Sequence, residues 1–143
     1  MVLVPGGPGE EALRTDDHML EWLRAAHEAS RWTTSVCTGA LTLAAAGLLG
    51  GIEATTHWRA MDDLARLGAV PVTERWVQRV RIITAAGVSA GIDMALHLLA
   101  LEAGPERASR PGHPRVRPPA AVQRRIAGEA PPAIPAALRA RLA

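Results

Sequence analysis

The chain has 143 residues, of which 48% are hydrophobic, and this length suits one globular domain rather than two. Four Trp without any Phe or Tyr argue against a base-stacking surface for nucleic acid, and the single Cys excludes an intramolecular disulfide and a zinc site of several Cys. The formal net charge of +2 divides unevenly: residues 1–104 carry eight Arg against twelve acidic residues, or −4, whereas residues 105–143 carry eight Arg against two, or +6.

The N-terminal half of the chain predicts strands and helices in alternation. Residues 2–4 form a brief apolar run that is typical of a strand. Asp16 is placed to cap an amphipathic helix, whose apolar face consists of Met19, Leu20, Leu23 and Ala26. Residues 32–36 predict a second strand. Residues 38–49 are apolar nearly all round, so they predict a buried helix, which a glycine pair ends.

The next part of the chain continues this alternation. A strand is predicted over residues 54–56, and a helix over residues 58–68 has on one side Met61, Leu64 and Ala65. Residues 70–77 and 81–85 are rich in β-forming side chains. The last helix, over residues 90–102, carries at helical spacing Ile92, Ala95, Leu96 and Leu99. Strands alternating with helices favour an α/β layered fold with a mostly parallel sheet.

The composition changes beyond Gly104, where eight of the eleven Pro are found together with the excess of Arg. We therefore expect a compact domain over residues 1–104 and a Pro/Arg-rich tail over residues 105–143. Arg spaced by Pro without aromatic residues is typical of a solvated extension, so no nucleic-acid partner is expected. A short C-terminal helix is predicted from the repeat of Ile134, Leu138 and Leu142.

The chemically informative point is Cys37, where a predicted strand turns directly into a predicted helix. A nucleophile at such an elbow needs small neighbours, and Gly39 and Ala40 supply them. The helix N-terminus favours negative charge and so favours the reactive thiolate. The alternative is that Cys37 is a small core residue, since unpaired Cys is among the most buried side chains.

Five blocks in order give the chain a resemblance to the ThiJ/PfpI family of the class I glutamine-amidotransferase-like superfamily, nearest to its isonitrile hydratases. The blocks are VLVPGGPG (2–9), SVCTGA (35–40), AGLLGG (46–51), ATTHW (54–58) and AGVSAGID (86–93). The resemblance implies a flavodoxin-like three-layer α/β sandwich, a homodimer, a small-molecule substrate and no cofactor.

The resemblance also implies a site and a reaction. Cys37 would attack the terminal carbon of an isonitrile, and water would then release an N-substituted formamide. Thr38 would orient substrate or water, Gly6 and Gly7 would offer backbone N–H groups to the reacting centre, and His57 would be a base or thiolate partner. The alternatives stay open: Thr38 closes the helix N-terminus, the two Gly form a tight turn, and His57 packs in the interior or at a subunit interface.

Two departures from the family pattern matter. Family members that act as peptidases often place His directly after the cysteine, where this chain has Thr38, so protease activity is disfavoured. The chain also starts at the glycine-rich loop, so one or two βα units, on the order of 60 residues, are expected to be missing at the N-terminus together with an acidic partner of the cysteine. Asp93 is expected to begin the last helix and to favour its dipole.

Two other functions fit the same blocks. One is the ligand-sensing domain of an AraC-type transcriptional regulator, and the other is a cysteine-dependent glyoxalase or stress protein of the same family. No metal site is expected, because His18, His27 and His97 lie on predicted helices without the partners that a metal needs. The longest apolar stretch, residues 40–52, is too short to span a bilayer, and a cytoplasmic location is expected.

Overall fold

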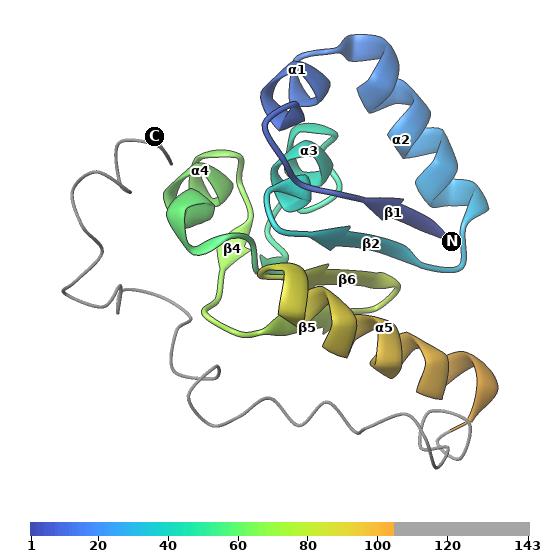
Figure 1. Cartoon of the computed structure of the whole chain (residues 1–143). Helices are drawn as coiled ribbons and strands as arrows, with labels where there is room; N and C mark the ends of the chain where they lie inside the picture. The colour runs from blue at the N-terminus through green and yellow to red at the C-terminus, as the bar shows by residue number, and fades with distance from the viewer. Residues whose placement is uncertain (105–143) are drawn as a thin grey trace, which may run out of the picture.

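A four-stranded, mostly parallel sheet forms the centre of the computed structural model (Figure 1). Its order is β1 (Val2–Val4), β2 (Thr33–Val36), β6 (Ile82–Ala85) and β5 (Trp76–Arg79). The first three strands pair in parallel, and β5 runs antiparallel to β6. The structure describes residues 1–104, so the helix predicted around Leu138 lies outside the described residues.

Helices cover both faces of this sheet. The helices α1 (Glu10–Arg14), α2 (Asp17–Ala29) and α3 (Gly39–Ala45) lie on one side, and α5 (Val88–Ala103) crosses in front of β5 and β6 on the other (Figure 1). This arrangement confirms the predicted three-layer α/β fold with a mostly parallel sheet.

The remaining elements connect α3 to β5. A second small sheet pairs β3 (Glu53–Ala54) in parallel with β4 (Val70–Pro71). Between them lie the short 3-10 helix η1 (Trp58–Ala60) and α4 (Met61–Arg66). Leu64 of α4 is completely buried in the core. Burying such a side chain stabilises the fold by about 2 kcal/mol.

The two sides of the sheet form two hydrophobic clusters. Val2, Val4 and Ile82 pack with α2 and α3, whereas Ile83 and Ala85 pack with α5. Side chains alternate between the faces of a strand, so Ile82 and Ile83 enter different clusters. Both clusters are aliphatic except for two partly buried Trp beside α5, as expected for a chain without Phe and Tyr.

The helices differ from the prediction in three places. The helix α1 was not predicted, because it has five residues and directly follows a glycine-rich loop. The helix α3 ends at Ala45 and not at the later glycine pair, since Gly47 has a positive φ of 79°. The helix α5 begins at Val88, which places Asp93 in its second turn rather than at its N-terminus.

The side of α5 that is buried differs from the apolar residues noted at helical spacing in the sequence. Its buried residues are Ala90, Met94 and Leu98, whereas Ile92 and Leu99 are exposed. The helix is apolar on nearly every side, so hydrophobic periodicity carries little information about which side meets the sheet. The face of α2 was predicted correctly at Leu20 and Leu23, because the opposite side of that helix is polar, and Asp16 caps it as expected.

Val80 holds a strained position at the tip of the β5–β6 hairpin. The pairing of Arg79 with Ile82 leaves a two-residue loop, in which Val80 has a positive φ of 52° and is 91% exposed. This conformation favours Gly at the first loop position, and a residue with a Cβ lowers the stability of the fold there by about 1–2 kcal/mol.

Replacing Val80 by Gly is therefore expected to raise the free energy of unfolding by about 0.5–1 kcal/mol, after the greater chain entropy of unfolded Gly is subtracted. Urea denaturation measures the change. Val80→Ala is the matched control, because Ala keeps the Cβ and hence most of the strain. A gain for Ala equal to that for Gly would contradict the assignment of the strain to backbone conformation.

Candidate functional site

Cys37 occupies the elbow between β2 and α3. Its φ is 59°, in the left-handed region that non-glycine residues seldom adopt. The main chain is held on both sides: the Cys37 N–H donates to the Ala85 carbonyl at 2.9 Å, and the Cys37 carbonyl accepts from the Thr56 hydroxyl at 2.8 Å. These two bonds fix the half-buried Cys37 between β6 and the loop before η1.

The glycine-rich loop after β1 closes against this elbow. A Cβ placed on Gly6 would lie 2.6 Å from the Thr38 nitrogen and 2.9 Å from the Cys37 Cβ. A Cβ on Gly39 would collide with the carbonyl oxygen of Val4. Real side chains do not come this close, so the approach of the loop to the elbow depends on glycine at both positions. Gly39 was predicted from the sequence as one of the small neighbours that the cysteine elbow requires.

The hydroxyl of Thr38 links the elbow to the loop. The Gly7 N–H donates to Thr38 Oγ1 at 3.2 Å, and the Thr38 side chain makes no capping bond to α3. Because Oγ1 accepts this bond, the hydroxyl hydrogen of Thr38 is available to a molecule bound next to the elbow. The structure thus brings together four of the predicted site residues, which are Gly6, Gly7, Cys37 and Thr38.

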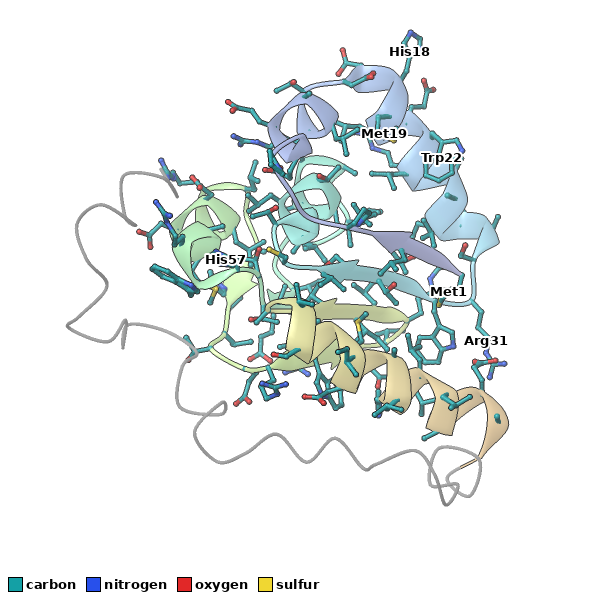
Figure 2. The ribbon with its side chains drawn as sticks, in the orientation of Figure 1. Met1, His18, Met19, Trp22, Arg31 and His57 are labelled. Atoms are coloured by element: carbon teal, nitrogen blue, oxygen red, sulfur yellow. The ribbon has the colours of Figure 1, made fainter. Side chains whose placement is uncertain are left out.

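His57 is connected to the cysteine only indirectly, through the preceding residue Thr56. It follows Thr56, which bonds to the Cys37 carbonyl, and it starts η1 by accepting the Arg59 N–H at its Nδ1 atom at 3.4 Å. Figure 2 shows His57 at the end of the sheet opposite to Met1 and Arg31. Among residues 1–104, no hydrogen bond joins His57 directly to Cys37.

Burial, and to a smaller extent the positive charge of Arg59, lower the pKa of His57 below its ordinary value of 6.5. The imidazole is therefore neutral at neutral pH, with the lone pair of Nδ1 directed to the Arg59 N–H and the proton on Nε2. In this form His57 offers a hydrogen-bond donor at Nε2. It does not supply the positive charge that would pair with a thiolate.

The lowered pKa of His57 predicts a pH-dependent contribution to stability. A group whose folded-state pKa lies below its unfolded value stabilises the fold above the unfolded value, and this contribution is lost as the pH falls through the folded value. His57→Asn is expected to keep an N-cap acceptor that does not titrate, so its urea stability should fall less than that of wild type between pH 7.5 and 5.

The matched variant is His57→Ala, which removes the acceptor and is expected to be about 1 kcal/mol less stable at pH 7.5. The pKa of His27 is lowered as well, by burial first, but this residue is unchanged in all three proteins and its titration cancels in the comparison. If the Asn variant lost stability with acid as steeply as wild type, His57 would not be the group that titrates.

Sequence reasoning missed the role of the two Thr before His57. Thr55 holds the neighbouring chain in place: its N–H donates to Thr84 Oγ1 at 2.9 Å, and its hydroxyl donates to the Glu74 carbonyl at 3.0 Å. Together with the bond from Thr56 to Cys37, these contacts pin the loop before η1 to the sheet. The signal was present in the block ATTHW, where two neighbouring hydroxyls precede the histidine.

A second missed contact is the ion pair between Arg75 and Asp93. Arg75 Nε lies 2.7 Å from Asp93 Oδ2, and both side chains are largely buried. Gly91 lies two residues before Asp93 and against Val36, where a Cβ would be 3.0 Å from a methyl group. The pair therefore holds the first turns of α5 close to the residue that precedes the cysteine.

One carboxyl group lies at the end of the glycine-rich loop. The Glu10 N–H donates to the Gly7 carbonyl at 3.1 Å, and the Glu10 side chain is buried with Arg14 Nε 3.4 Å from its Oε1 atom. Burial is the main cause that raises the pKa of Glu10 above its ordinary value. The glycine-rich loop is thus followed directly by a carboxyl group that holds its proton more readily than an exposed one.

Two further histidines, His27 and His97, have structural partners, whereas His18 is exposed on α2. His27 Nδ1 lies 2.7 Å from Thr33 Oγ1, and the His97 ring stacks on Trp76 with centroids 4.2 Å apart. Within residues 1–104, no group of three or more His, Cys, Asp and Glu side chains is placed to hold a metal ion. Over the same range, no helix combines the length and the apolar character needed to cross a membrane.

Two hollows on the surface lie away from Cys37. One of about 500 Å³ is lined by residues that include His27, Leu48, Ile52 and Arg81, and another of about 420 Å³ has in its lining Glu74 and Trp76. Neither is lined by a residue of the elbow or of the glycine-rich loop. The candidate site is therefore defined by the contacts around Cys37 and not by either of these hollows.

Comparison with known sequences agrees with this geometry. The DJ-1/PfpI family model matches residues 1–101. The chain is 48% identical over 98 residues to an isonitrile hydratase of Pseudomonas putida, which covers 68% of the chain and 43% of that protein. It is also 36% identical over 108 residues to the HTH-type transcriptional regulator GbdR of Pseudomonas aeruginosa, which covers 73% of the chain and 29% of the regulator. The chain thus spans less than half the length of these relatives.

Solved structures show the same fold. A ThiJ/PfpI family protein from Pseudomonas syringae superimposes with a TM-score of 0.68 at 33% identity, over 86% of this chain and 57% of that one. Schizosaccharomyces pombe DJ-1 gives a TM-score of 0.63 at 22% identity, over 75% of this chain and 57% of that one, and supports the fold alone.

Proposed function

The chain belongs to the DJ-1/PfpI family, and from this premise we propose that it hydrates isonitriles to N-substituted formamides with Cys37 as the nucleophile. The observation that carries the proposal is the backbone of Cys37, which is held in a strained conformation by bonds to Ala85 and Thr56. Strain of this kind clusters at functional sites, and an elbow of this type presents its side chain to a substrate. The identity to an isonitrile hydratase supports the choice of reaction.

The proposed reaction has two stages. The Cys37 sulfur attacks the terminal carbon of R–N≡C, and the proton that the thiol gives up is transferred to that carbon, which gives the thioimidate R–N=CH–S–Cys37. Water then adds to the same carbon while the nitrogen takes a proton. The tetrahedral intermediate collapses, the C–S bond breaks, and R–NH–CHO leaves with the thiol regenerated. The sum is R–NC plus H₂O giving R–NH–CHO.

The neighbours of Cys37 supply positioning. The free hydroxyl hydrogen of Thr38 can bind the substrate nitrogen or orient the attacking water, while Gly7 keeps Oγ1 in place. Gly6 lets the glycine-rich loop and its backbone N–H groups approach the elbow closely, since any Cβ there would collide with Thr38. A neutral His57 acts as a hydrogen-bond donor at Nε2 rather than as the positive partner of a thiolate.

The test is a direct product assay. The purified chain is incubated with cyclohexyl isocyanide, and N-cyclohexylformamide is measured by mass spectrometry against a buffer blank. Time-dependent formation of the formamide is expected. A parallel incubation with methylglyoxal distinguishes the hydratase from the glyoxalase alternative, because only a glyoxalase consumes methylglyoxal. Consumption of methylglyoxal without any formamide would overturn the hydratase proposal.

The similarity to GbdR supports a second candidate, a ligand-sensing domain without turnover. A sensor holds its ligand through the same site but does not form a product. For this candidate we expect small molecules to raise the melting temperature of the chain while no formamide accumulates. Turnover of cyclohexyl isocyanide that continues beyond one equivalent per chain would exclude it in favour of the enzyme.

A further inference from the structure

The larger of the two surface hollows, of about 500 Å³, lies at the end of the sheet that is remote from Cys37. Ile82, which belongs to its lining, begins β6 and is in register with Thr33 at the start of β2, whereas Cys37 follows the end of β2. The lining comes from the last turn of α2, from the segment that leads from α3 into β3, and from the β5–β6 hairpin. We call it the hairpin hollow. Its volume falls within the range of about 300–1,000 Å³ that is typical of small-molecule sites.

His27 presents a hydrogen-bond donor to the hairpin hollow. This residue is only 9% exposed and belongs to the lining. Its Nδ1 atom lies 2.7 Å from Oγ1 of Thr33, a fully buried residue whose hydroxyl has no other partner among residues 1–104. The Thr33 hydroxyl therefore donates to Nδ1. Burial, and after it the charge of Arg81, lower the pKa of His27, so the neutral ring carries its proton on Nε2. Over the same range no hydrogen bond engages Nε2, which leaves this N–H available to a ligand.

The charged side chains of the lining are two Arg and one Glu, so their charges sum to +1. Arg81 is held in place at the C-terminal end of α2, where its Nη1 donates to the carbonyl of His27 at 2.8 Å. Arg79 is paired with Glu53. Glu28 also lies 3.4 Å from Arg81, but it is 78% exposed and outside the lining, so water screens its charge. The hollow therefore offers donors and a positive charge to a ligand that carries acceptors.

The rest of the wall is apolar. Leu48, Ile52 and Ile82 belong to the hydrophobic cluster under α2 and α3, and they also line the hollow. Val80 extends this wall to the tip of the hairpin, where it has its strained φ of 52° and is 91% exposed. Because so little of this side chain is buried, packing within residues 1–104 does not offset the strain, whereas a ligand in the hollow would cover it. Strain that persists without such compensation is typical of a functional position.

We propose that the hairpin hollow binds a small organic carboxylate, with its hydrocarbon chain against the apolar wall and its carboxylate directed to His27 Nε2 and Arg81. A carboxylate carries acceptors only, which suits a lining that presents donors. One negative charge balances the sum of +1, whereas the doubly charged form of phosphate would leave an excess that has no partner. The site does not use Cys37, so it does not rest on the proposed hydration reaction.

The size of the ligand sets the expected affinity. Hexanoate is a suitable probe, because it combines one carboxylate with a short apolar chain in about eight non-hydrogen atoms. The exposed Val80 shows that the hollow is open on the side of the hairpin, so the ligand remains partly in contact with water. For a ligand of this size we expect a dissociation constant on the order of 0.1–1 mM. Because hexanoate would bind the folded chain only, it should also raise the melting temperature.

The first test is isothermal titration calorimetry of the full chain with hexanoate, hexanamide and inorganic phosphate. Hexanamide keeps the apolar chain without the charge, and phosphate keeps the charge without the chain, so both should bind at least about tenfold more weakly than hexanoate. The titration is repeated after alkylation of Cys37 with iodoacetamide, which should leave the affinity for hexanoate unchanged. Hexanamide that binds as tightly as hexanoate, or loss of hexanoate binding after alkylation, would overturn the proposal.

Variants of the lining locate the ligand. Arg79→Gln removes a positive charge and releases Glu53, so it should weaken hexanoate binding by about tenfold. Arg66→Gln is the matched control, because Arg66 is also an exposed Arg that pairs with a carboxylate, that of Asp63, but lies outside the lining; its affinity should stay within about twofold of wild type. Val80→Gly, which is expected to be more stable than wild type, should bind about threefold more weakly because an apolar contact is lost. Absence of hexanoate binding to wild type at 10 mM, or wild-type affinity in both Arg79→Gln and Val80→Gly, would each contradict the proposed site.

Discussion

Replacing Cys37 by Ser is expected to lower formamide production from cyclohexyl isocyanide by at least about 10³-fold. The Ser hydroxyl is not ionised at neutral pH and is a weak nucleophile unless a base activates it, and the Nδ1 lone pair of His57 is already engaged by the Arg59 N–H. The main-chain bonds to Ala85 and Thr56 do not involve the side chain at position 37, so the elbow should persist in the variant. Initial rates at saturating substrate measure the loss.

The matched control for this variant is Thr38→Ser, which keeps the hydroxyl that accepts the Gly7 N–H. It should retain activity within about tenfold of wild type, while both variants should melt close to wild type. A Cys37→Ser protein that turns over at the wild-type rate would refute the nucleophile assignment. Parallel losses in both variants would place the effect in the shape of the elbow rather than in the thiol.

The second large effect is expected for Gly39→Ala, which should lower the free energy of unfolding by about 3 kcal/mol or more. The added methyl group would meet the carbonyl oxygen of Val4 and would come within 2.9 Å of the Pro5 carbonyl oxygen. These are main-chain atoms of β1 and the following loop, which cannot rotate away as a flexible side chain can. The collision can be relieved only if the glycine-rich loop moves away from the elbow. The rate at which iodoacetamide alkylates Cys37 should therefore change as well.

Gly50→Ala is the control for the change of residue type. The nearest atom to its added Cβ is the Gly47 carbonyl oxygen at 4.0 Å, so the variant should stay within about 1 kcal/mol of wild type. Urea denaturation at neutral pH compares the two. Equal stabilities would show that α3 and β1 can separate at no cost, which would contradict the close approach described at the elbow.

The sequence was most informative where polar and apolar residues are segregated. Residues 17–29 alternate between a polar and an apolar side, so both the helix and its buried face were predicted correctly. The strands β1, β2 and β6 were predicted from short β-forming runs. The orientation of α5 was not predicted from the sequence, because nearly all of its sides are apolar and only tertiary contacts decide which side meets the sheet. The tight approach of Gly39 to Val4 is likewise a property of packing, although the need for small residues was visible.

For the candidate site, a single Cys between a strand and a helix was a strong signal, and the family blocks located the loop that meets it. The contact between Thr56 and the Cys37 carbonyl could not be predicted, because it joins segments 19 residues apart through a side chain with several possible partners. The same holds for the bond between Gly7 and Thr38. Contacts of this kind depend on the exact path of two loops, which propensity and periodicity do not encode.

The left-handed conformation of Cys37 has a consequence for the balance between stability and reactivity. A residue with a Cβ loses about 1–2 kcal/mol at such a φ, and Gly would adopt it without strain. A Cys37→Gly chain is therefore expected to unfold at higher urea concentration than wild type, even though its thiol is gone. The residue proposed as the nucleophile is thus one whose replacement by Gly would stabilise the fold. Part of the stability that the two hydrophobic clusters supply offsets the strain of holding a sulfur atom at the elbow.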